Sequence, residues 1–128
     1  MSFVFSARSR RALTGVHPDL VAVAEDALAL SPIDFRVIEG LRSPARQAEL
    51  VRAGASRTLN SRHLTGHAID VVALMDGKVR WDWPLYPRIA AAFKQAARNR
   101  GVNLVWGGDW ARLRDGPHFE LDRKAYPA

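Results

Sequence analysis

The chain has 128 residues, of which 48% are hydrophobic and 25% charged, which fits one compact soluble domain and excludes an intrinsically disordered chain. Cysteine is absent, so a disulfide framework and a thiolate zinc finger are excluded, and any metal must be held by His, Asp or Glu. Nineteen Lys and Arg against 13 Asp and Glu leave a net charge of +6, which favours anionic partners such as nucleic acid, anionic lipid or bacterial wall polymers without choosing among them.

The N-terminal stretch MSFVFSARSRRAL contains no apolar run long enough for a signal peptide or a transmembrane helix. We therefore expect synthesis in the cytoplasm and no stable insertion into a membrane. The chain shows no internal repeat, low-complexity tract or linker, and we expect a single domain over residues 1–128.

The first half of the chain contains two helix patterns and one strand pattern. HPDLVAVAEDALALS, residues 17–31, has apolar residues at helical spacing and Pro18 in the first turn, which predicts a helix. DFRVIEG, residues 34–40, alternates apolar and polar residues and predicts a short strand. SPARQAELVRAG, residues 43–54, predicts a second helix with Ser43 as its N-cap.

The second half contains mainly strand patterns around one long helix. AIDVVALMDGKVRW, residues 68–81, predicts two strands joined by an Asp-Gly turn. YPRIAAAFKQAARNRG, residues 86–101, predicts a long helix that stops at its final glycine. VNLVWG, residues 102–107, and PHFEL, residues 117–121, predict the last two strands. Helices and hairpins intermixed without a βαβ series predict an α+β fold with a mainly antiparallel sheet and flanking helices.

Chemistry-bearing residues gather in the stretch SRHLTGHAID. His63 and Asp70 lie on either side of Gly66, and a loop that bends at this glycine into a strand would point both side chains inward. A third ligand is available from His118, which begins the last strand and shares a face of it with Glu120. Two histidines and a carboxylate, with a fourth position open to water, are typical of hydrolytic zinc enzymes.

Asp115 lies three residues before His118 in RDGPHFEL, within reach of a metal-bound water without being a ligand. A carboxylate there could take a proton from the attacking water and pass it to the leaving amine. Spacing alone leaves a second interpretation open, in which the candidate ligands form only a polar network and Arg42 is a surface or salt-bridging residue. We expect His17 to cap or precede the first helix and His67 to be an exposed residue rather than a ligand.

The pattern S-x-H-x-x-G-x-A-x-D at residues 61–70, followed downstream by D-x-x-H at residues 115–118, resembles the signature of the VanY-type D-Ala-D-Ala carboxypeptidase family of zinc peptidases. EGLRSPARQAEL, WGGDW and DGPHFEL occur in the same order, which makes the chain most similar to the small phage L-alanyl-D-glutamate endopeptidases, endolysins that cut the stem peptide of peptidoglycan. The resemblance extends from GVHPDL to HFEL and implies a hedgehog/DD-peptidase-like fold.

The resemblance also implies roles for single residues. It places Zn²⁺ on three ligands, which are His63, Asp70 and His118. It makes Asp115 the catalytic base, at a position where the wider family often has the longer glutamate. Arg42 matches an arginine that binds and polarises the substrate carbonyl, and Ser61 matches a serine near the substrate.

From this resemblance we expect a monomeric, zinc-dependent phage or prophage endolysin that cuts the L-Ala–D-Glu bond and reaches the cell wall after another protein permeabilises the membrane. The positive charge would concentrate it on the anionic wall, or would simply solvate the surface. Two alternatives stay open, a D-Ala-D-Ala carboxypeptidase or dipeptidase with the same zinc centre and a non-catalytic wall-binding module. We expect no nucleic-acid partner, because the sequence has no helix-turn-helix, aromatic platform or basic stripe.

Overall fold

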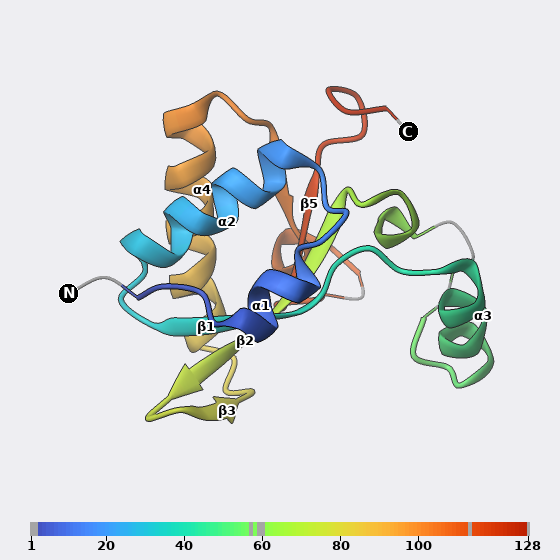
Figure 1. Ribbon diagram of the computed structural model, residues 1–128, viewed down its shortest axis with the longest axis horizontal. Coiled ribbons are helices and arrows are strands. Elements are labelled where there is room, and N and C mark those ends of the chain that lie inside the picture. The colour runs from blue at the N-terminus through green and yellow to red at the C-terminus, as the bar shows by residue number, and fades with distance from the viewer. Residues whose placement is uncertain (1–2, 57, 59–60, 113, 128) are drawn as a thin grey trace.

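An antiparallel sheet of five strands forms the frame of the computed structural model, which describes residues 3–56, 58, 61–112 and 114–127 (Figure 1). The strands in chain order are β1 Asp34–Glu39, β2 Ala68–Met75, β3 Lys78–Arg80, β4 Leu104–Trp106 and β5 His118–Leu121. Their spatial order is β1-β2-β5-β4, and β3 pairs with the end of β2. Strand β2 is therefore central, because it is hydrogen-bonded to β1, β3 and β5.

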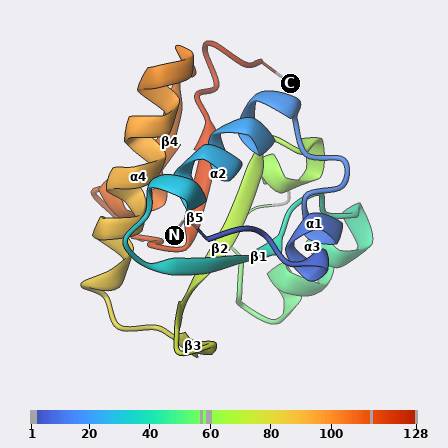
Figure 2. The same cartoon turned by 60° about the vertical axis from the view of Figure 1, so that its left-hand side comes forward.

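Helices lie on both sides of this sheet. They are α1 Ala7–Ala12, α2 Pro18–Leu30, α3 Pro44–Arg52 and α4 Leu85–Arg100, with short 3-10 helices η1 Arg62–Thr65 and η2 Gly107–Asp109. Helices α2 and α4 pack against each other, and α3 lies on the opposite side of the molecule from α4 in both views (Figures 1 and 2). The predicted fold class is confirmed. Within the described part of the chain, no helix is both long and apolar enough to cross a membrane.

The apolar core lies on one face of the sheet, against α2 and α4. The strands contribute alternate side chains to this core: Phe35, Val37, Ile69, Val71, Phe119 and Leu121. Phe119 of β5 stacks on Phe93 of α4 with ring centroids 3.8 Å apart. Because successive side chains of a strand point to opposite faces, the intervening residues Asp70, His118 and Glu120 face away from the core. The fold thus separates an apolar face of the sheet from a polar one.

Local signals place the predicted helices as expected. The ring of His17 caps α2, with Nδ1 accepting the backbone N–H of Asp19 at 3.1 Å. The Ser43 hydroxyl caps α3 by accepting the N–H of Arg46 at 3.1 Å. Gly101 ends α4 in the left-handed conformation with φ 67°. These caps satisfy backbone groups that a helix end otherwise leaves unpaired.

Helix α1 was not predicted, because its sequence ARSRRA has no apolar residues at helical spacing. The structure shows that it is held by a polar contact instead. Ser9 of α1 is buried, and its hydroxyl accepts the backbone N–H of Val37 in β1 at 3.2 Å. The helix is therefore fixed by the sheet rather than by a hydrophobic stripe.

Candidate metal centre

Strand pairing brings two of the predicted ligands together. Asp70 of β2 and His118 of β5 are direct partners in the antiparallel ladder, on the polar face of the sheet. Side chains at such paired positions are immediate neighbours, and Asp70 Oδ1 lies 3.1 Å from His118 Nδ1. Two residues separated by 48 positions in the sequence therefore meet because of the register of two strands.

His63 is brought to the same place by η1. The Ser61 hydroxyl accepts the His63 backbone N–H at 3.2 Å and so caps this short helix, and Gly66 ends it in the left-handed conformation with φ 75°. His63 Nδ1 lies 2.9 Å from the Gly40 carbonyl, which can only accept a hydrogen bond, so Nδ1 carries the proton. The other ring nitrogen, Nε2, faces Asp70 Oδ2 at 3.3 Å.

The three side chains form a compact group that can hold a metal ion. Each offers one ligand atom, and these atoms all lie within 4.8 Å of one another. The rings of His63 and His118 are 5.2 Å apart at an angle of 70°, and both residues are buried. Two imidazoles and one carboxylate that converge in this way fit the donor set of a divalent transition metal. The sequence alone could not separate a metal site from a polar network, and this convergence favours the metal site.

Glu120 orients His118 from the opposite side of the ring. Its Oε1 lies 2.8 Å from His118 Nε2, and its Oε2 lies 3.6 Å from Arg123 Nε. Metal-binding histidines commonly donate their second ring N–H to a carboxylate, which fixes the tautomer and the orientation of the ring. Nδ1 is therefore the atom of His118 that faces the group. The sequence showed that the two residues share a strand face but did not reveal this contact.

Hydrogen bonds outweigh burial in their effect on the pKa values of Asp70 and His118. Burial raises the pKa of Asp70, but hydrogen bonds from His118 and His63 more than offset this and hold the pKa well below its usual range. Burial lowers the pKa of His118, but its hydrogen bonds to Asp70 and Glu120 outweigh that effect and raise the pKa to about 9. In metal-free protein at neutral pH, His118 is thus an imidazolium paired with Asp70. A metal ion must displace its Nδ1 proton.

The group lies in a cavity of about 590 Å³. All six predicted site residues line it: Arg42, Ser61, His63, Asp70, Asp115 and His118. Helix α3 and the segment after it form one wall, with Arg46, Leu50 and Ser56, and Trp110 and Arg114 lie on another part of the lining. His67 is not among the residues that line this cavity, and its ring centroid lies 5.5 Å from that of His17.

Asp115 is held at the cavity by the turn before β5. Its backbone N–H donates to the Gly107 carbonyl at 3.0 Å, and its carbonyl accepts from the His118 N–H at 3.1 Å. Burial raises the pKa of the Asp115 carboxyl, and the negative charge of Asp70 raises it further. A carboxyl whose pKa is shifted toward neutrality is suited to exchanging a proton during catalysis.

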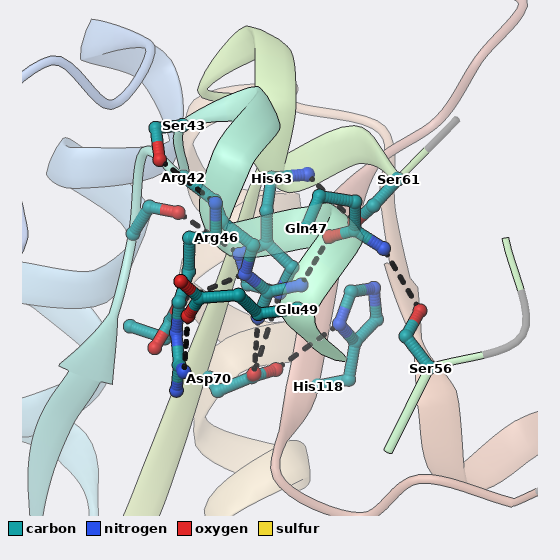
Figure 3. A network of polar contacts seen from close by, with 12 residues as sticks. Arg42, Ser43, Arg46, Gln47, Glu49, Ser56, Ser61, His63, Asp70 and His118 are labelled. Carbon is teal, nitrogen blue, oxygen red and sulfur yellow. Dashed lines mark hydrogen bonds and ion pairs between the residues drawn. The ribbon is translucent and has the colours of Figure 1, made fainter. Parts of the chain in front are cut away.

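Arg42 lies beside the centre with its guanidinium bonded on several sides (Figure 3). Nε donates to Glu39 Oε1 at 2.7 Å, and Nη1 donates to Gln47 Oε1 at 2.8 Å. Nη2 lies 3.7 Å from Asp70 Oδ2. Arg42 is thus a salt-bridged residue that also lines the cavity next to a candidate metal ligand.

Comparisons with known proteins show which family the chain resembles. The family model "Phage L-alanyl-D-glutamate peptidase" matches residues 1–128. The chain is 38% identical over 130 residues to the L-alanyl-D-glutamate peptidase of Escherichia phage T5, covering 98% of this chain and 94% of the relative. It is 31% identical over 132 residues to the peptidoglycan L-alanyl-D-glutamate endopeptidase CwlK of Bacillus subtilis strain 168, covering 83% of this chain and 73% of the relative.

A solved structure is similar over almost the whole chain. The crystal structure of the Serratia marcescens L-Ala D-Glu endopeptidase ChiX has a TM-score of 0.94 and 57% sequence identity, covering 99% of this chain and 96% of that one. The match of the family model to residues 1–128 and these similarities show that the chain belongs to the phage L-alanyl-D-glutamate peptidase family.

Proposed function

We propose that this protein is a zinc-dependent peptidoglycan hydrolase that cleaves the L-Ala–D-Glu bond of the stem peptide. The observation that supports it best is the convergence of His63, Asp70 and His118 in a cavity of a chain that is 57% identical to an L-Ala D-Glu endopeptidase. Residues 1–128 would act as one peptidase domain.

The donor set is suited to zinc. His63 would bind through Nε2, His118 through Nδ1 and Asp70 through its carboxylate, because Gly40 and Glu120 occupy the other ring nitrogens. Three protein ligands leave a fourth position open, as in catalytic rather than structural zinc sites. Zinc held there supplies a Lewis acid that polarises a peptide carbonyl and makes water more acidic.

Asp115 would accept a proton during the hydrolysis and later donate it. The oxygen of a water molecule attacks the carbonyl carbon of L-Ala while the Asp115 carboxylate accepts a proton from that water. The C–N bond then breaks, and Asp115 passes the proton to the leaving amine of D-Glu. The products are a carboxylate on L-Ala and a new amino terminus on D-Glu. The raised pKa of Asp115 supports this role, because it eases the return of the proton.

Arg42 and Ser61 would bind the substrate at the same cavity. The Arg42 guanidinium would donate hydrogen bonds to the L-Ala carbonyl oxygen, where negative charge grows as the carbon becomes tetrahedral. Removing one such preorganised donor typically costs about 10²–10³ in rate. Ser61 lines the cavity, and its hydroxyl would contact the peptide backbone.

In its biological setting we infer a phage or prophage endolysin that works as a monomer and meets the wall once the membrane is permeabilised. Stem peptides carry carboxylates, so the net charge of +6 would draw the enzyme to its substrate.

Digestion of purified peptidoglycan, with mass spectrometry of the new termini, tests the proposal. We expect stem fragments with N-terminal glutamate, and no such fragments from His63→Ala protein. Release of free D-Ala instead would assign the D-Ala-D-Ala carboxypeptidase activity. Binding to the wall without cleavage would indicate a non-catalytic module.

A further inference from the structure

Helix α3 has one buried side chain, and that side chain is polar. The structure describes all nine residues of α3, and of these only Gln47 is buried, with 1% of its surface exposed. A buried amide is unfavourable unless its donors and acceptor are paired. Gln47 is not part of the apolar core cluster, so its burial serves something other than hydrophobic packing.

The amide of Gln47 connects Arg42 to the wall of the cavity (Figure 3). Its Oε1 accepts from Arg42 Nη1 at 2.8 Å. Its Nε2 donates to the Ser56 hydroxyl at 2.9 Å and to the Thr58 carbonyl at 2.5 Å. Both ends of the amide are therefore used, one toward a site residue and the other toward residues that line the cavity.

These contacts determine how the Arg42 guanidinium is turned. The group is planar and rigid, so bonds at two of its nitrogens fix the orientation of its plane. Glu39 holds Nε and Gln47 holds Nη1, which leaves Nη2 beside Asp70 at 3.7 Å. Without Gln47, the guanidinium could rotate about the remaining contact with Glu39.

We propose that Gln47 is a positioning residue for Arg42, which it holds in the orientation that meets the substrate carbonyl. This inference rests on the proposed function, because the contact between Arg42 and the substrate is part of that proposal. Preorganised donors stabilise a transition state more than a ground state. Loss of Gln47 should therefore lower kcat more than it raises KM.

Gln47→Leu is the direct test, because leucine removes the amide and keeps a side chain of similar size. Gln95→Leu is the matched control, since Gln95 is exposed on α4 and its side chain hydrogen-bonds to Asn99 and Arg98 on the same helix, away from the cavity. On a soluble stem peptide we expect kcat to fall about tenfold to a hundredfold for Gln47→Leu, less than for outright loss of a donor, and to stay unchanged for Gln95→Leu. An unchanged kcat for Gln47→Leu would overturn the proposal.

A double-mutant cycle distinguishes positioning from general damage. If Gln47 acts through Arg42, Gln47→Leu should cost no further activity in an Arg42→Ala background. An equal loss in both backgrounds would contradict the proposal, because it would show that Gln47 acts independently of Arg42.

A readout without turnover separates this proposal from the proposed function. In NMR spectra of the isotope-labelled protein, the Nη1 hydrogens of Arg42, which bond to Gln47, should exchange slowly with water in the wild type and in Gln95→Leu, and quickly in Gln47→Leu. Gln47→Glu keeps the acceptor for Arg42 and loses both donors, so it should retain slow exchange even if the leucine variant does not fold. Fast exchange in a folded Gln47→Glu protein, or slow exchange in Gln47→Leu, would overturn the proposal whether or not the wild type cleaves peptidoglycan.

Discussion

Both histidines of the candidate metal centre have a second polar partner that determines which ring nitrogen faces the centre. The Gly40 carbonyl occupies Nδ1 of His63, and Glu120 occupies Nε2 of His118. Asp70 uses one oxygen toward each imidazole. The ligand atoms therefore face the centre before a metal binds, which lowers the free-energy cost of ordering them on binding.

Metal binding and proton transfer should be separable by mutation. His63→Ala removes a ligand, so we expect the purified protein to lose both zinc and activity. Asp115→Ala leaves the ligands intact, so zinc should stay bound while kcat falls by about 10²–10⁴, the usual contribution of a general base. Metal content after dialysis, measured beside kcat, checks both. Loss of zinc from the Asp115 variant would overturn this division of roles.

The metal-free protein should be most stable in a defined pH range. The pKa of His118 is raised from 6.5 to about 9, so its contribution is complete below pH 6.5 and is lost as the pH rises through about 9. The pKa of Asp70 is lowered from 3.8, so its contribution is complete above pH 3.8 and is lost as the pH falls.

Thermal unfolding in the presence of a chelator measures this dependence. We expect the highest melting temperature between roughly pH 4 and pH 6.5, and a decline toward pH 9 that is smaller in His118→Gln. An equal alkaline decline in the variant would show that His118 is not the group responsible.

At the scale of elements, the site depends on one strand pair and one short helix. The register of β2 and β5 brings Asp70 to His118, and η1 brings His63 to both. Gly66 ends η1 with φ 75°, and a Cβ there would lie 2.5 Å from the Gly15 carbonyl oxygen. Both the backbone conformation and the space at this position therefore require glycine.

A matched pair of glycine variants tests how much η1 contributes. Gly54 also has φ 75°, but a Cβ there would meet nothing within 4 Å. Gly54→Ala should lower the free energy of unfolding by only about 1 kcal/mol, because alanine is less stable than glycine in the left-handed conformation. Gly66→Ala should cost more and should also weaken zinc binding, because the clash displaces η1 and with it His63. Urea unfolding and zinc titration of both variants measure this. Equal effects would contradict the role given to Gly66.

Much of this architecture could be predicted from local sequence signals. Periodicity and caps predicted α2, α3, α4 and the strands, because those signals lie within a few residues of one another. The six-residue helix α1 was missed, since it is held by a side-chain bond from Ser9 to β1. The stretch before Gly66 was expected to be a loop and contains η1.

The candidate site could be predicted from a family resemblance rather than from local signals. Sequence spacing does not show that His118 contacts Asp70, because strand register is a long-range property. The resemblance to zinc peptidases indicated the three metal ligands together. Glu120 and Gln47 were not assigned roles. Gln47 looks in sequence like any glutamine on a helix, and its hydrogen bonds to Arg42 and Ser56 are made only in the folded chain.

At the scale of the whole molecule, the sheet has its core on one face and its cavity on the other. The net charge of +6 attracts anionic partners over longer distances than the contacts made in the core or in the cavity. Lysis of whole walls should therefore fall steeply as salt is raised, because screening weakens attraction to an anionic polymer. Hydrolysis of a short soluble stem peptide should fall less. Equal salt dependence for the two substrates would show that the charge only solvates the surface.

A zinc titration of metal-free protein during digestion of peptidoglycan tests the proposed metal centre most directly. We expect release of fragments with N-terminal glutamate to stop on chelation, to rise linearly with added zinc and to reach a plateau at one ion per chain, whereas His118→Ala protein should stay inactive. Cleavage that persists in the chelated protein, or that His118→Ala retains, would contradict the assignment of His63, Asp70 and His118 as the metal centre of this peptidase.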